Sequence, residues 1–412
     1  MVRGERSLIG ALSLAHGLVH AIEITYAILL TRIGDDLGVG VATLGFVANA
    51  SAFTLGASSL PAGYLTDRLG SRNVFYLTFL GAAGAAVLVG LSPNIVVLGL
   101  TLGVLGFTVG LYHPPAIALL AQSTRQRGIA LGYHGIVGNM GLALSPLVAT
   151  ALAAAFDWRA AYFFLAGLAV VVVFLLRWIL PQISATAAYQ QARPAHRGEG
   201  SQRHAYGDSL LPLFTVFAVL ILTGFIYRGA LTFLPAHLEA GLKFELFGRS
   251  GADLAGFLVT PLLLMGGIGQ YVGGWLSQRF TLERLAPAFT LLLAPALLFT
   301  GAGSGVVLLV AAAGYIFFSF GAAPVYDLLI ADYTPPRFLG RSYGLAFFAA
   351  SGIGSLGGTF AGLFAQRWDT AAVYLALSGF GVIVTLLSLT LWLRSLQERP
   401  APVAIAADGG DG

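Results

Sequence analysis

Long apolar stretches separated by short polar segments constrain this chain of 412 residues more than any other feature. Twelve stretches hold the roughly 20 apolar residues that a helix needs to cross the hydrocarbon core of a bilayer. Only 10% of the residues are charged, whereas soluble domains carry about 25%. The sequence therefore predicts an all-α membrane protein with twelve transmembrane helices, and it excludes soluble and disordered classes. The predicted spans are residues 7–33, 41–65, 73–91, 94–121, 128–154, 158–180, 211–238, 250–278, 281–302, 304–331, 338–365 and 370–396.

The spans form two groups of six, and a polar segment lies between the groups. This segment is rich in Ser, Gln, Arg and His and has no apolar stripe, which is typical of a flexible linker. The C-terminal residues have a composition that predicts disorder. We therefore expect an N-terminal six-helix bundle over 1–180, a linker over 181–210, a C-terminal six-helix bundle over 211–396 and a disordered tail over 397–412.

The positions of the basic residues predict the orientation in the membrane. The chain holds 21 arginines and one lysine; with a cytoplasmic N-terminus, sixteen of them fall in cytoplasmic segments and five on the opposite side. Positive residues favour the cytoplasmic side, so both termini and the linker are predicted to be cytoplasmic in a multi-pass protein of the inner cell membrane. Because the arginines are spread over many short segments, no nucleic-acid partner is expected.

Motifs for catalysis and for cofactors are missing from the sequence. The chain has no cysteine, which removes disulfides, iron–sulfur clusters and thiolate metal sites. It contains neither a G-x-S-x-G nucleophile elbow nor a phosphate-binding loop. We therefore expect a protein that is not an enzyme and that needs no cofactor.

The two groups of spans resemble each other at a nearly constant offset, which indicates an internal repeat. The segment Gly63-Tyr-Leu-Thr-Asp-Arg68 after the second span matches Gly274-Trp-Leu-Ser-Gln-Arg279 after the eighth, 211 residues later. Three further pairs match at an offset of 212: Gly128 with Gly340, Gly132 with Gly344, and Asp157 with Asp369.

The loop Gly63-Tyr-Leu-Thr-Asp-Arg-Leu-Gly-Ser-Arg72 resembles the signature loop of the major facilitator superfamily of secondary transporters. Three further stretches are similar to the fosmidomycin-resistance-like efflux branch of that family, together with His16: Tyr112-His113-Pro114, Gly138-Asn-Met-Gly141 and Ser145-Pro146. The resemblance implies two pseudo-symmetric six-helix bundles that rock about a site between them near the middle of the bilayer. We expect the protein to act as a monomer.

The signature loop also implies a conformational latch. Asp67 is predicted to face the N-terminal end of the eleventh span, near Gly340 and Arg341, when the cytoplasmic side is closed. Arg72 is expected to bridge neighbouring segments. The full set of predicted latch residues is Gly63, Asp67, Arg68, Gly70 and Arg72.

Ionisable residues inside the spans are the candidates for function, because burying Asp or Arg near a span centre costs about 2.5–3.5 kcal/mol. In the first span, His16, His20 and Glu23 share one helix face, since residues i, i+4 and i+7 lie within about 60° of one another. By the resemblance, the first, fourth, seventh and tenth spans line the central cavity. The predicted substrate and proton site is therefore His16, His20, Glu23, His113, Arg228 and Asp327.

Structural roles are the alternatives for several of these residues. One alternative is that His113 donates a hydrogen bond to a backbone carbonyl that Pro114 leaves without its helical N–H partner. Another alternative is that Glu23 and Arg228 form a static buried ion pair that fixes the packing of the helices. His134 lies near the inner end of its span and is expected at the membrane interface.

The spacing H-x-x-x-H-x-x-E in the first span is also suited to zinc or iron ligands. A metalloprotease needs a glutamate directly after the first histidine, and Gly17 occupies that position. Hydrolysis is thus excluded and no resident metal is expected, while a metal ion as transported cargo remains an alternative.

A proton-coupled efflux antiporter for a small organic anion or drug is the function that these patterns favour, with drug resistance as one outcome. A carboxyl group in a cavity of low dielectric constant takes up protons more readily than in water, so Glu23 is expected to couple transport to protons, with Asp327 as its competitor. Arg228, His20 and His113 favour a phosphonate or carboxylate substrate. A proton symporter for a small organic anion, a metal-cation transporter and a non-transporting sensor remain alternatives.

Overall fold

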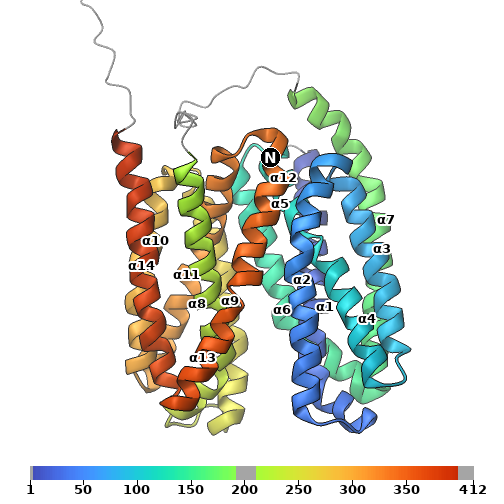
Figure 1. Ribbon diagram of the computed structural model, residues 1–412, viewed down its shortest axis with the longest axis vertical. Coiled ribbons are helices and arrows are strands. Elements are labelled where there is room, and N and C mark those ends of the chain that lie inside the picture. Colours follow the sequence, from blue (N-terminus) through green and yellow to red (C-terminus); the bar gives the residue numbers. More distant parts are fainter. Residues whose placement is uncertain (1–2, 192–209, 398–412) are drawn as a thin grey trace, which may run out of the picture.

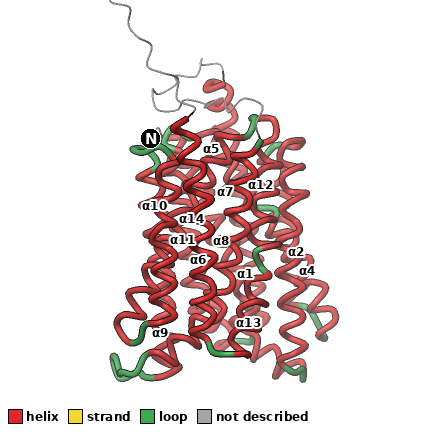
Figure 2. The backbone as a smooth tube through the Cα atoms, turned by 60° about the vertical axis from the view of Figure 1, so that its left-hand side comes forward, coloured by secondary structure: helices red, strands yellow, loops and turns green. Residues whose placement is uncertain are grey.

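The structure, a computed structural model, describes residues 3–191 and 210–397. Nearly all of these residues are helical, and the helices run along one common direction (Figures 1 and 2). Within the described ranges, eleven helical segments are long and apolar enough to cross a membrane. With α2 (Val41–Leu69), which has 29 residues, they make twelve spans. The predicted all-α membrane fold is confirmed.

The N-terminal half consists of six spans, and its fourth span is broken into two helices. The elements of this half are α1 (Arg3–Leu37), α2 (Val41–Leu69), α3 (Ser71–Gly90), α4 (Ile95–Gly110), α5 (His113–Ser123), α6 (Arg127–Ala155) and α7 (Trp158–Gln191).

The C-terminal half repeats this arrangement, and in it the eleventh span is the broken one. Its elements are α8 (Leu211–Gly241), α9 (Gly251–Leu276), α10 (Leu282–Ala302), α11 (Gly305–Tyr333), η1 (Pro336–Phe338), α12 (Leu339–Phe347), η2 (Phe348–Ile353), α13 (Leu356–Arg367) and α14 (Thr370–Gln397).

Local sequence explains the break in the fourth span and the tight turn after α2. Pro114 and Pro115 have no N–H group, so they begin α5 and prevent α4 from continuing through them. The eleventh span contains a π-helical stretch, η2, at its middle, and such stretches are frequent at functional sites. Gly70 ends α2 with φ 76°, a left-handed value that favours glycine and lets α3 begin at the next residue.

The two halves contact each other mainly on the side of the membrane where α1 and α6 begin, called here the N-terminal side. There α6 packs against α9, and α12 packs against α2 and α5. The outer part of the eleventh span, α13, packs instead against α8 and α14 of its own half. Figure 1 shows α12 beside the N-terminal half, and α13 apart from α2 at the opposite end. The halves are therefore closed toward the N-terminal side.

The predicted linker is only partly within the described residues. Helix α7 continues to Gln191, past the predicted end of the sixth span at residue 180. Alanine and glutamine in this stretch favour helix over the flexible coil that its polarity predicts. The rest of the linker up to residue 209, and the tail from residue 398, lie outside the described residues.

Candidate functional site

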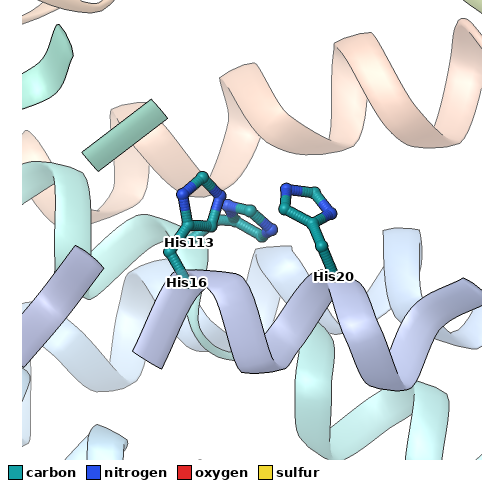
Figure 3. Close-up of side chains that lie close together, drawn as sticks. All are labelled: His16, His20 and His113. Carbon is teal, nitrogen blue, oxygen red and sulfur yellow. The ribbon is translucent and has the colours of Figure 1, made fainter. Parts of the chain in front are cut away.

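A cluster of histidines lies between α1, α5 and α6 in the N-terminal half. The ring centroids of His16 and His20 are 4.6 Å apart, and His113 lies 5.1 Å from His16 and 5.6 Å from His20. Figure 3 shows the three rings gathered on one side of α1. The predicted helix face of the first span and the predicted histidine of the fourth therefore do meet.

His134 of α6 completes the cluster, and here the prediction was wrong. Its ring stacks on His16 at a centroid distance of 3.9 Å and an interplanar angle of 7°. Its backbone oxygen is 2.8 Å from His16 Nδ1, and its side chain is buried. His134 thus lies inside the protein instead of at the membrane interface.

Tyr112 was also missed as a site residue, although it stands in the quoted motif before His113. It is fully buried, and its hydroxyl donates to the backbone oxygen of Leu12. The hydroxyl oxygen of Tyr112 also lies 3.2 Å from His134 Nε2. The break before Pro114 is the sequence signal that places Tyr112 and His113 here. Tyr112, which directly precedes α5, therefore contacts both α1 and α6 next to the histidines.

Small residues allow α1 and α6 to approach closely at this level. A Cβ atom added at Gly138 would collide with the His16 ring, and one added at Gly141 would collide with the backbone of Gly17. Gly138 and Gly141 follow His134 at spacings of four and seven residues on one face of α6. That spacing is the signal by which His134 was detectable from the sequence.

An ion pair joins the two halves next to the histidine cluster. Oε2 of Glu23 in α1 lies 2.9 Å from Nδ1 of His20. Oε1 of Glu23 accepts a hydrogen bond of 3.4 Å from Nη2 of Arg228 in α8. The side chains of His20 and Glu23 are each 25% exposed, and that of Arg228 is 34% exposed. The pair is therefore partly exposed, whereas His16, His113 and His134 are buried.

The C-terminal half also contributes an aromatic ring to the site. Phe347, the last residue of α12 before the π-helical stretch η2, stacks on His113 with a centroid distance of 4.2 Å. Nothing in the sequence pattern identified Phe347, because apolar periodicity does not show which ring of one half packs against the other half.

Asp327 is the predicted site residue that the structure does not bring into contact with the others. It lies in α11, and its backbone oxygen accepts a hydrogen bond from Tyr343 Oη at 2.7 Å. Within the described residues, no hydrogen bond or ion pair joins its carboxylate to Glu23, Arg228 or the histidines.

The predicted latch residues lie on the N-terminal side, away from the cluster. Asp67 accepts hydrogen bonds from the backbone N–H groups of Gly340 and Arg341, at 2.9 and 3.1 Å, and lies 3.3 Å from Arg341 Nε. It thus faces the first turn of α12, where sequence reasoning placed it.

The remaining latch residues differ in their contacts. A Cβ atom at Gly63 would collide with the backbone oxygen of Gly340, and Arg68 lies over the Tyr64 ring. Arg72 donates to Tyr76 Oη of its own helix at 3.2 Å, so it does not make the expected bridge between segments.

A separate cavity of about 430 Å³ lies between α1, α6 and α7. Its lining is apolar apart from the side chains of Thr25 and Ser145, and it contains none of the predicted site residues. It suits hydrocarbon chains better than an anion.

Comparison with known proteins agrees with this architecture. A family model described as Major Facilitator Superfamily matches residues 12–326. The crystal structure of the transporter FucP in the outward conformation has a TM-score of 0.69 and 14% identity over 94% of this chain and 99% of that chain. That likeness establishes the fold.

Two curated relatives carry names that describe transport. The chain is 27% identical to the fosmidomycin resistance protein of Escherichia coli (strain K12), over 89% of this chain and 88% of the relative. It is 24% identical to the probable sulfoacetate transporter SauU of Cupriavidus necator, over 68% of this chain and 66% of the relative.

Proposed function

The chain belongs to the major facilitator superfamily of transporters, and on that premise we propose that it is a proton-coupled transporter of a small organic anion. One relative is named for resistance to fosmidomycin and another for transport of sulfoacetate. The sequence similarity to both supports an anionic substrate and makes these two compounds suitable probes.

The ion pair between Glu23 and Arg228 is the observation that carries this proposal. It joins α1 to α8, one helix from each half, and its side chains are partly exposed. In alternating access the halves move relative to each other around the substrate. A pair that links them at this level therefore changes with each step of the cycle.

Competition for Arg228 gives a physical mechanism of coupling. An anionic substrate that pairs with the guanidinium displaces Glu23, because a single arginine makes its strongest bidentate contact with one anionic group. The released carboxylate, still beside His20, then binds a proton instead of remaining an unpaired charge. When the proton leaves, Glu23 pairs with Arg228 again and the substrate is released. Proton and anion therefore bind together and leave together, which is the order of symport.

We extend the proposal to the oligomeric state of the protein, its membrane and its orientation. We place it as a monomer in the inner cell membrane, with both termini and the segment between the halves in the cytoplasm. The division into bundles over 1–180 and 211–396 is part of the same proposal, since the Glu23–Arg228 exchange requires two halves that move as units.

Proteoliposomes with an imposed pH gradient test the proposal, with fosmidomycin and sulfoacetate as labelled substrates. Arg228→Ala is expected to weaken binding of the anion about 10- to 150-fold at every pH, because it removes a charge-assisted hydrogen bond of about 1.5–3 kcal/mol. Arg367→Ala removes an exposed arginine outside the site and serves as the matched control. Unchanged affinity in Arg228→Ala would remove Arg228 from the substrate site.

Glu23→Gln separates coupling from binding. The substitution keeps the shape of the side chain and removes its titration, so pH-driven transport should be lost while substrate exchange across the membrane continues. Glu239→Gln, at an exposed position of α8, is the control. If Glu23→Gln responds normally to the pH gradient while Asp327→Asn does not, proton coupling belongs to α11.

A further inference from the structure

The histidine cluster has the chemistry of a metal site as well as that of a transport site. Among the residues that the structure describes, His16, His20 and His113 each offer a ring nitrogen, and these nitrogens lie within 4.8 Å of one another. Neutral imidazole is a preferred ligand of Zn²⁺ and related transition-metal ions. The three rings come from two segments, α1 and α5, so the fold and not just one helix creates the group (Figure 3).

Two of the rings are already oriented in the way that metal ligands usually are. His16 Nδ1 is 2.8 Å from the backbone oxygen of His134, and His20 Nδ1 is 2.9 Å from Glu23 Oε2. An N–H group at Nδ1 donates to each of these oxygens, which leaves Nε2 with a lone pair. Metal-ligating histidines almost always donate their other ring N–H to a carbonyl or a carboxylate.

The second nitrogens of these rings have no competing partner in the protein. Within the described residues, no hydrogen bond is made by Nε2 of His16 or His20, or by either ring nitrogen of His113. Stacking on Phe347 and contact with His16 hold His113 in place without using its nitrogens.

The three ring nitrogens need to move only a short distance to bind one metal ion. Ligands of a tetrahedral Zn²⁺ site with Zn–N bonds of 2.0–2.1 Å are about 3.4 Å apart. The nitrogens therefore have to approach by at most about 1.4 Å, shared between two side chains. His20 is 25% exposed, which gives an ion a path from the space between the halves.

We propose that His16, His20 and His113 form a binding site for a divalent transition-metal ion, Zn²⁺, with Glu23 as the orienting partner of His20. Three protein ligands leave a fourth coordination position for water. The bound ion places two positive charges beside Glu23 and competes with Arg228 for its carboxylate. The site does not depend on the substrate of the transporter, and it goes beyond the sequence prediction of no resident metal.

Calorimetric titration of the purified full chain with Zn²⁺ tests the site. Two other histidines of the sequence, His196 and His204, are replaced by asparagine in every protein used, so that they do not bind the ion. We expect one Zn²⁺ per chain. His20→Gln and His113→Gln should each lower the affinity at least about 100-fold, and Glu23→Gln about 10-fold, the usual range for an outer partner.

His237→Gln is the matched control. His237 is also a buried histidine, but its Nδ1 is 2.9 Å from Thr370 Oγ1 and its Nε2 is 2.7 Å from the backbone oxygen of Thr300. Both of its nitrogens are engaged, so its loss should leave the affinity for Zn²⁺ unchanged.

A spectroscopic measurement on the unsubstituted cluster covers the case in which a variant does not fold. Co²⁺ bound by three imidazoles and one water should give the intense visible bands of a four-coordinate ion. Only weak six-coordinate bands, or equal affinity for Zn²⁺ in His20→Gln and in the parent, would overturn the proposal. Neither measurement involves transport, so the result is independent of the anion transport proposed above.

Discussion

Two contacts between the halves are related by the sequence repeat, yet they differ in chemistry. On one side α2 meets α12 through Gly63 and Gly340; on the other α9 meets α6 through Gly274 and Gly128. The glycines of the first contact match those of the second at offsets of 211 and 212. In both contacts a Cβ atom on the first glycine would collide with the backbone oxygen of the second.

The repeat also preserves an arginine that lies over an aromatic ring near each contact. Arg68 lies over Tyr64 at 4.9 Å, and Arg279 lies over Trp275 at 3.7 Å. These pairs stand at the same offset of 211. Close backbone approach and a basic residue stacked on a ring are therefore common to both halves.

The charge at the helix end is what separates the two contacts. Asp67 caps the first turn of α12 with two hydrogen bonds and an ion pair. Its repeat equivalent is Gln278, whose Nε2 donates to Ser277 Oγ at 3.4 Å; within the described residues it makes no hydrogen bond to the first turn of α6. The α2–α12 contact thus combines steric fit with electrostatics, whereas the α9–α6 contact depends on steric fit.

The largest effect is expected where the two contacts are alike. Gly63→Ala and Gly274→Ala each force two helix backbones apart, at a cost of about 1–3 kcal/mol. The population closed on the N-terminal side should fall about 5- to 150-fold. Because the chain has no cysteine, spin labels on Asn73→Cys and Arg337→Cys can report the distance between these ends by electron spin resonance.

Gly84→Ala is the control, since a Cβ atom at that glycine of α3 would meet nothing within 4 Å. It should leave the distance distribution unchanged. If Gly63→Ala lengthens the distance and Gly274→Ala does not, the two contacts are not mechanically equivalent despite the repeat.

The fold and the latch contact followed from the sequence because they depend on patterns along the chain. Spans are apolar runs, and the repeat matches Gly63 with Gly274 and Gly128 with Gly340 in the two halves. Asp67 was correctly expected at the end of the eleventh span, since a carboxylate stabilises a helix N-terminus.

The composition of the site was harder to predict because depth along one helix does not reveal what a neighbouring helix covers. His134 lies about 10 Å from the start of α6 at 1.5 Å per residue, which suggests the interface. Gly138 and Gly141 let α1 approach so closely that His16 stacks on His134. Phe347 was not identified, because the apolar periodicity of its span does not show which residue stacks on His113 across the two halves.

A smaller effect is expected where the contacts differ. Asp67→Ala removes the cap of α12 at a cost of about 0.5–2 kcal/mol, so closure should weaken about 2- to 30-fold. Asp67→Asn keeps one acceptor and loses about 0.3–1 kcal/mol of charge interaction. Both should slow transport and lengthen the same spin-label distance, while substrate affinity stays within a few-fold. A collapse of affinity with normal interconversion would show that Asp67 is not a latch.

The smallest effect is expected when the second contact is given the charge of the first. The amide of Gln278 lies close to Gly128, since a Cβ atom added at Gly128 would be 2.8 Å from Nε2 of Gln278. Gln278→Glu keeps the length of the side chain and places a carboxylate beside the first turn of α6. It should favour closure by about 0.3–1 kcal/mol, up to about fivefold. Salt at about 1 M should cancel this gain, because it screens charges beyond about 3 Å.

Gln278→Ala is the companion variant, because it removes the amide without adding a charge. It should leave the distance distribution as it is in the parent protein. A shift in Gln278→Glu that survives high salt would be steric in origin. The contrast between the two contacts would then lie in packing, and the carboxylate of Asp67 would not explain why α2 and α12 hold together.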